Sequence, residues 1–111
     1  MTTSATPVIR RADDRHRYEI LVDDELAGVA EYLDRGEQRV FYHTETHVDF
    51  AGQGLAARLV LHAMTDVRAT GRRVVPVCSY VARLLEKHDE FADITDPVTP
   101  EVKHWLREAL G

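Results

Sequence analysis

The spacing of apolar residues changes partway along the chain, from every second position to every third and fourth. In the first half, three runs rich in β-branched, aromatic and other apolar residues, residues 17–22, 26–33 and 38–48, are typical of strands, and in the first of them Tyr18, Ile20 and Val22 lie on one face. The intervening residues 23–25 and 34–37 contain the Asp and Gly residues that favour tight turns. The three runs therefore predict an antiparallel meander.

Helical spacing begins after the third run. Apolar residues then recur at i, i+3, i+4, i+7, i+8 and i+11, which is one face of an amphipathic helix, namely Ala56, Leu59, Val60, Ala63, Met64 and Val67. We expect this helix to run from about Gly52 to Thr70, with Gly71 following its end. Residues 72–78 are rich in valine and predict a fourth strand. A strand–helix–strand crossover would leave the third and fourth strands parallel or splayed.

Two shorter helices are predicted in the last third of the chain. Ser79 is a suitable N-cap for the first. Its apolar face comprises Val81, Leu84, Leu85 and His88. The acidic residues 89–96 are expected to form a loop, after which Thr99 can cap a second helix that has a proline and an acid in its first turn. The buried face of that helix comprises Val102, Trp105, Leu106, Ala109 and Leu110.

These elements predict one α+β domain, with a mixed, mostly antiparallel sheet flanked by helices. A chain of 111 residues, 44% of them apolar, supports a single core. We expect the domain to cover residues 15–111. Residues 1–14 are polar and indicate a flexible lead-in, with a short strand around residues 8–10.

Charge and cysteine content narrow the classes of function. The formal net charge is −5 and no Lys/Arg run exceeds two residues, which argues against a nucleic-acid-binding surface. The single cysteine, Cys78, excludes an internal disulfide and a multi-cysteine metal site. His43 and His47 would lie about 13 Å apart on a strand, so we expect no metal site. The sequence has no signal-like start and no apolar stretch long enough to span a membrane, and we expect a cytoplasmic protein without a membrane partner.

A pair of glycines marks the junction between the third strand and the first helix. The run is Gly52-Gln53-Gly54-Leu55-Ala56, called here the glycine turn (residues 52–56). Backbone N–H groups at a helix start have no intrahelical partner, and the helix dipole favours an anion there. Glycine also lets the backbone approach a ligand closely. The glycine turn therefore predicts a site for a phosphate-bearing ligand, with a purely structural turn as the alternative.

Four sequence blocks carry a family resemblance. They are His43-Thr44-Glu45, the glycine turn, Val74-Val75-Pro76-Val77-Cys78-Ser79-Tyr80-Val81 and Lys87-His88-Asp89-Glu90-Phe91. In this order and spacing they resemble the short branch of the GNAT superfamily of N-acetyltransferases. The resemblance implies acetyl-CoA as the co-substrate. It also implies a splayed sheet, in which the third and fourth predicted strands part to admit the pantetheine arm.

The same resemblance assigns the contacts with the co-substrate. Backbone groups of six residues are expected to bind the pantetheine and the pyrophosphate, namely Thr46, Gly52, Gln53, Gly54, Leu55 and Ala56. Ala51 departs from the pattern, because the superfamily usually has Arg or Gln at this position. Leu84 and Leu85 occupy the positions where many relatives have a tyrosine that protonates the leaving thiolate. That role is therefore vacant unless Tyr80 or Cys78 takes it.

Besides Tyr80, three side chains are candidates for the chemistry, namely Glu45, His43 and Cys78. Glu45, on the strand beside the expected thioester, would act as a general base or would be an ordinary solvated carboxylate. His43 has the same parity along the strand, so both side chains should lie on one face, where each would tune the pKa of the other; an ordinary packed or exposed histidine is the alternative. Cys78 ends a strand just before a helix start. It would act as a nucleophile, as the acid for the leaving thiolate, or as a small residue that lines the cleft.

The sequence thus predicts transfer of an acetyl group from acetyl-CoA to an amine. The acceptor is expected to be a small amine or a peptide or protein amine, and the negative net charge favours a cationic one. The alternative is a CoA-binding regulatory module with little or no transferase activity, which Ala51 and the missing tyrosine favour. A weaker alternative is an interaction domain whose glycine turn is purely structural. A monomer and a homodimer both fit the sequence.

Overall fold

The structure, a computed structural model, describes residues 6–111 and is built around one sheet. The strands lie in the order β1-β2-β3-β4-β5, and their bounds are Val8–Ala12, Arg17–Val22, Glu25–Arg35, Gln38–Thr46 and Arg73–Pro76. Neighbours from β1 to β4 are antiparallel, and β5 is parallel to β4. The predicted α+β class and the mixed, mostly antiparallel sheet are therefore confirmed.

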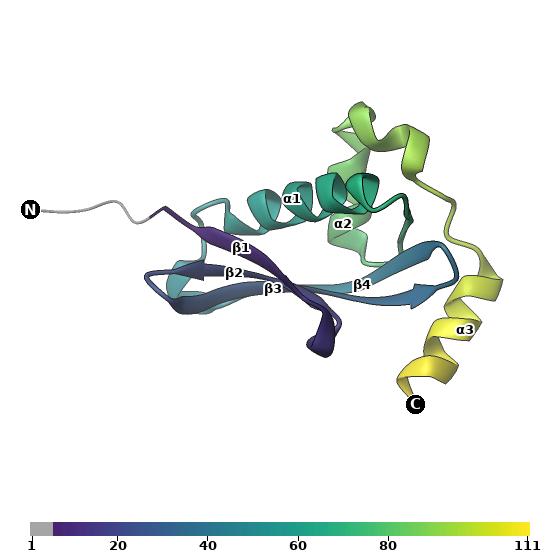
Figure 1. Cartoon of the computed structure of the whole chain (residues 1–111), viewed down its shortest axis with the longest axis horizontal. Helices are drawn as coiled ribbons and strands as arrows, with labels where there is room; N and C mark the ends of the chain where they lie inside the picture. The colour runs from purple at the N-terminus through teal and green to yellow at the C-terminus, as the bar shows by residue number, and fades with distance from the viewer. Residues whose placement is uncertain (1–5) are drawn as a thin grey trace, which may run out of the picture.

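Helices cover both faces of this sheet (Figure 1). The α-helices are α1 (Leu55–Ala69), α2 (Ser79–Glu86) and α3 (Pro100–Leu110), and the short 3-10 helices are η1 (Asp13–Arg15), η2 (Val48–Phe50) and η3 (Asp89–Ile94). In Figure 1, α1 lies along one face of the sheet, whereas α3 lies at the far end beside the C-terminus. No helix in residues 6–111 is long and apolar enough to cross a membrane.

The larger core cluster lies between the sheet and α1. Tyr18, Tyr32 and Phe41 bring their rings within 5.4–5.9 Å of one another, and they pack against Leu59 and Met64 of α1. These sheet residues fall on alternating positions of β2, β3 and β4, so one face of each strand is buried under the helix. The predicted apolar face of α1 is confirmed, since all six of its residues except Ala56 are buried.

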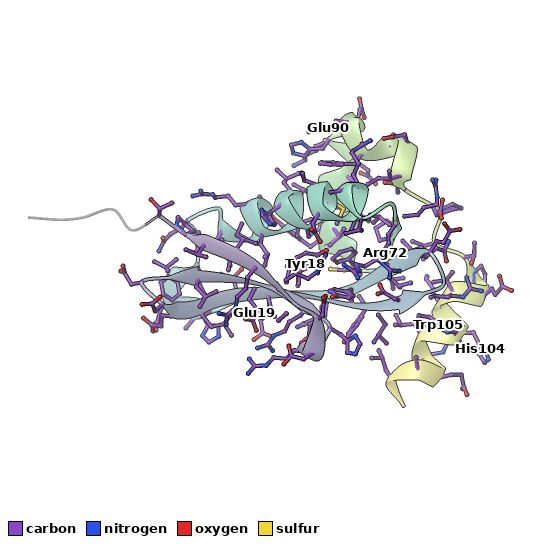
Figure 2. The ribbon with its side chains drawn as sticks, viewed as in Figure 1. Tyr18, Glu19, Arg72, Glu90, His104 and Trp105 are labelled. Atoms are coloured by element: carbon purple, nitrogen blue, oxygen red, sulfur yellow. The ribbon has the colours of Figure 1, made fainter. Side chains whose placement is uncertain are left out.

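A smaller core cluster lies on the other face, under α3. Val102 and Leu106 pack against Val40 of β4 and Val75 of β5, and Trp105 lies on the sheet side of α3 in Figure 2. The helix begins as predicted, because the hydroxyl of Thr99 accepts a 3.1 Å hydrogen bond from the N–H of Val102. Figure 1 shows that α3 covers only one end of this face. We call the remainder, away from α1, the open face.

Two segments are more ordered than the sequence indicates. The short strand predicted around residues 8–10 is confirmed, but it is longer than expected, because β1 covers residues 8–12 of the expected lead-in and pairs with β2 along its length. Residues 1–5 of the lead-in lie outside the described residues. The segment expected to be an acidic loop after α2 contains η3 instead. Its Phe91 and Ile94 are 6% and 9% exposed and complete the core under α1. Both segments contain too few apolar residues to show a strand or helix periodicity in the sequence.

Candidate functional site

The sheet opens between β4 and β5. The two strands pair in parallel from Gln38 and Arg73 to Phe41 and Pro76, and the N–H of Cys78 then donates a 2.9 Å hydrogen bond to the carbonyl oxygen of Phe41. From there the chain turns into α2, whereas β4 continues to Thr46. Residues 42–46 of β4 therefore have a neighbouring strand only on the β3 side. Their other edge offers backbone groups to an extended ligand.

The glycine turn lies at the end of the sheet where β4 finishes and α1 begins (Figure 1). Gly52 and Gly54 have φ values of 82° and 70°, in the left-handed region that glycine adopts most easily. A left-handed residue cannot belong to a right-handed helix, so α1 begins at Leu55 rather than at about Gly52. A Cβ atom at either glycine would meet nothing within 4 Å. The space in front of the turn is therefore open.

The first turn of α1 presents unpaired donors to that space. Gly54 is the N-cap residue and supplies no side-chain cap, and the N–H of Arg58 makes the first hydrogen bond, 3.3 Å to the oxygen of Gly54. In the part of the chain that the structure describes, the N–H groups of residues 55–57 donate to no protein acceptor. Three N–H groups and the helix dipole together make a site suited to phosphate oxygens.

His43 and Glu45 lie together on the open face. The Nε2 atom of His43 is 3.0 Å from Oε1 of Glu45, and the two side chains are 48% and 60% exposed. In the register of β3 and β4, they stand opposite Glu31 and Val29. The residues next to Val29 and Glu31 on β3 point toward α1, so Val29 and Glu31 themselves face away from it. Residues paired across two strands share a face, so His43 and Glu45 face away from α1 as well. The predicted shared face of His43 and Glu45 is therefore confirmed.

Cys78 and Tyr80 lie on the other side of β4. The Sγ atom of Cys78 is 3.5 Å from the hydroxyl of Thr44, which stands between His43 and Glu45 along the strand and so faces the opposite way. Tyr80 is half-buried and packs against the core cluster under α1. The four predicted catalytic side chains thus form two groups, one on each face, rather than a single cluster.

Two residues that the sequence did not single out join the group on the open face. Glu31 stands opposite His43. Tyr42 has no partner in the register, because β4 contains one extra residue where β3 passes from Glu31 to Tyr32. Tyr42 packs on the α3 side of the sheet, and burial together with the nearby carboxylate of Glu31 raises its pKa. If the side chains of β4 alternated strictly, Tyr42 would lie on the opposite face from His43. Only the register shows that the two side chains share a face.

Within residues 6–111, no three His, Cys, Asp or Glu side chains gather where they could hold a metal ion. The carboxylates of Glu31 and Glu45 lie on the same side of the sheet as the imidazole of His43 and the phenol of Tyr42. Groups of this kind bind ammonium ions and transfer protons.

Comparisons with known proteins point to one family. The sequence model described as GCN5-related N-acetyl-transferase matches residues 17–94. The structure is similar to the solution structure of a GCN5-like putative N-acetyltransferase from Staphylococcus aureus, with a TM-score of 0.64, 18% identity, and coverage of 84% of this chain and 91% of that chain. It is also similar to the ribosomal-protein-S18-alanine N-acetyltransferase from Escherichia coli, with a TM-score of 0.54, 14% identity, and coverage of 64% and 49%. A search of curated proteins gave no match.

Proposed function

Because the chain belongs to the GCN5-related N-acetyltransferase family, we propose that it transfers an acetyl group from acetyl-CoA to an amine. The observation that carries this proposal is the combination of an open β4 edge with the glycine turn at the end of the same strand. The edge suits an extended chain with amide groups, such as pantetheine, and the turn suits a pyrophosphate. Both belong to one ligand, acetyl-CoA.

The proposed contacts with acetyl-CoA are mainly backbone contacts. Thr46 and its neighbours on β4 would pair with the pantetheine amides. The glycine turn, which includes Gln53 and Ala56, would supply N–H donors to the pyrophosphate. Ala51 is exposed and has no polar side chain, so the backbone alone would hold this part of the ligand. Such a site depends on local geometry more than on side-chain type.

Acetyl transfer requires a free amine and a departing thiolate. The amine nitrogen bonds to the thioester carbonyl carbon, the carbon–sulfur bond breaks, and one proton leaves the nitrogen. We assign that proton to the pair formed by His43 and Glu45, which is exposed to solvent and able to pass it on. An α-amino group, whose pKa is about 8, needs less help from a base than a lysine amine, whose pKa is about 10.4. This difference favours an α-amine as the acceptor.

The departing thiolate makes a modest demand on the protein. A simple thiol has a pKa of about 8.5, so a thiolate released near neutral pH is protonated readily by water. The vacant tyrosine position is therefore compatible with catalysis. Leu84 and Leu85 occupy it and pack against the core. We assign Cys78 and Tyr80 to the wall of the pantetheine slot rather than to proton transfer.

A CoA-binding module with little transferase activity is the second candidate. The separation of Cys78 and Tyr80 from His43 and Glu45 favours it, because the two pairs of predicted catalytic side chains lie on opposite faces of the sheet. The two candidates share the acetyl-CoA site. They differ in whether an amine reacts there.

Two measurements test the proposal. Calorimetric titration with acetyl-CoA should give saturable binding, and absence of binding at millimolar ligand would exclude both candidates. Release of free CoA thiol should then be followed with a panel of small amines, lysine peptides and peptides with free N-termini. Release above the hydrolysis background with at least one acceptor is the expected result. Binding of acetyl-CoA without such release would leave the module as the function.

A further inference from the structure

A cluster of arginines surrounds one buried carboxylate on the open face. Glu19 is 1% exposed, and Figure 2 shows it on the side of the sheet away from α1 and from Tyr18. Its Oε1 lies 2.8 Å from Nε of Arg10. Its Oε2 lies 2.7 Å from Nε of Arg17 and 3.5 Å from Nη1 of Arg15. We call Arg10, Arg15 and Arg17 the arginine cluster.

The arginine cluster carries more positive charge than Glu19 neutralises. Burial disfavours the Glu19 carboxylate, but the hydrogen bonds and charges of Arg10 and Arg17 outweigh this effect and lower its pKa. Glu19 is therefore ionised at neutral pH, and its single charge faces three guanidinium groups. The neighbouring Arg11 adds nothing to this excess, because its guanidinium is bound by carboxylates of Asp13 and Asp66.

The excess charge is held in a fixed position that a ligand can reach. Arg10 and Arg17 contact Glu19 through Nε, and within residues 6–111 their terminal nitrogens donate no side-chain hydrogen bond to the protein. Arg10 and Arg15 are 56% and 59% exposed. A hollow of about 280 Å³ lies beside them, with Asp14 also on its lining. Guanidinium groups anchored at one edge and free at the other are suited to oxyanions.

The arginine cluster and the proposed acceptor site lie on the same face. Arg17 stands opposite Glu31 in the register of β2 and β3, and Glu31 stands opposite His43 in that of β3 and β4. Adjacent strands are about 4.8 Å apart. Arg17 and His43 are thus separated by about 10 Å, and Arg10, on β1, lies about one strand further away. An extended peptide covers this span with three to four residues.

We propose that the arginine cluster binds an acidic group of the acceptor. The acceptor is then a peptide whose reactive amine is followed, three to four residues later, by an aspartate or glutamate. This inference rests on the proposed acetyl transfer and specifies its substrate. Glu31 and Glu45 attract the ammonium end, and the arginine cluster attracts the acidic end. The same two carboxylates repel a polyanion such as RNA, so a peptide fits this face better.

The test compares the binding of two peptides in the presence of CoA. One has a free N-terminus and glutamates at its fourth and fifth positions; the other has glutamines there, and both carry a fluorophore at the C-terminus. Anisotropy should show at least about fivefold tighter binding of the glutamate peptide, with a preference that shrinks as salt increases. The double variant Arg10→Ala, Arg15→Ala should lose the preference. Arg107→Ala, which removes an exposed charge from α3, should keep it.

Several outcomes would overturn the inference. They are equal binding of the two peptides, a preference that survives in the double variant, and equally cluster-dependent binding of a single-stranded RNA. Folding is controlled by Arg10→Lys with Arg15→Lys, which retains both charges and should retain most of the preference. Binding does not require turnover. A glutamate preference without acetyl transfer would therefore count against the proposed function alone, and acetyl transfer without the preference against the inference alone.

Discussion

A Cβ atom placed on Gly28 would lie 2.8 Å from the carbonyl oxygen of Glu45. This close approach of β3 to the end of β4 leaves no room for a side chain, so Gly28→Ala must push the β4 edge outward. We expect a loss of about 1–3 kcal/mol in the free energy of unfolding and at least about tenfold weaker acetyl-CoA binding, both measurable by denaturation and calorimetry. Gly36→Ala, in the β3–β4 turn, is the control. It should lower stability and leave acetyl-CoA binding unchanged.

The two ends of α1 provide a matched pair of glycines. Gly54 precedes the helix and Gly71 follows it, with φ values of 70° and 76° and no atom near a hypothetical Cβ. Substitution by alanine should cost each variant about 1 kcal/mol of stability, because an L-residue is strained there. Only Gly54→Ala should weaken acetyl-CoA binding, since its Cβ would project into the space proposed for the pyrophosphate. Equal affinities of the two variants would show that the glycine turn is purely structural.

Much of the fold was predictable because its signals are local. The apolar runs of the three strands, the helical spacing of α1 and the Thr99 cap each depend on residues close in sequence, and they predict the antiparallel meander, the buried face of α1 and the start of α3. The start of α1 was misplaced because a glycine can be read as part of a helix or as a left-handed residue before it. Only the backbone dihedral angles decide between these.

The open face was not predictable because it depends on register. Arg17, Glu31 and His43 are far apart in sequence, and they form one row only because β2, β3 and β4 pair as they do. The extra residue at Tyr42 also shifts the alternation in the middle of a strand. Net charge was a poor guide for the same reason. The overall value of −5 conceals a positive area at the arginine cluster.

Cys78 is expected to be dispensable as a nucleophile. Its Sγ contacts Thr44, whereas His43 and Glu45 face away from it across β4, and a thiol nucleophile needs a base within reach. Cys78→Ala should lower kcat by less than about tenfold, with Ser79→Ala as the neighbouring control. Intact-mass analysis of the wild-type protein with acetyl-CoA should show no acetyl adduct. An adduct on Cys78 that disappears when an amine is added would establish a ping-pong route instead.

The β2–β3 turn contains backbone strain that a single substitution should relieve. Asp23 and Asp24 have φ values of 52° and 65°, as a two-residue hairpin turn of type I′ requires, and the second position of such turns favours glycine. Asp24→Gly should raise stability by about 0.5–1 kcal/mol and the Tm by roughly 3–5 °C. Asp14→Gly, in η1, should not raise the Tm. A lower Tm for Asp24→Gly would mean that the Asp24 side chain contributes more than its backbone strain costs.

A buried arginine should make the protein sensitive to acid. Arg39 is 4% exposed and donates hydrogen bonds of 2.8 and 3.0 Å to the two oxygens of Asp34. It also donates one of 2.8 Å to the hydroxyl of Tyr18, which in turn donates to Asp66. Burial disfavours both carboxylates, but the hydrogen bonds and charges around them outweigh this and lower the pKa of Asp34 and of Asp66.

Because these pKa values are lower in the folded state, the stability they provide is complete above the unfolded pKa of about 3.9 and is lost as the pH falls through the folded values. The Tm should therefore drop steeply below about pH 4. Asp34→Asn should cost about 2 kcal/mol at pH 7, since it leaves Arg39 partly unpaired, and should flatten the drop. Glu19 and Asp96 also have lowered pKa values, so some acid dependence should remain.

The control is Val40→Ala, which removes core packing without changing a charge. It should lower the Tm at every pH and keep the full dependence of the Tm on pH. A weaker dependence of the Tm on pH in that variant would show that the acid sensitivity does not arise from the carboxylates around Arg39.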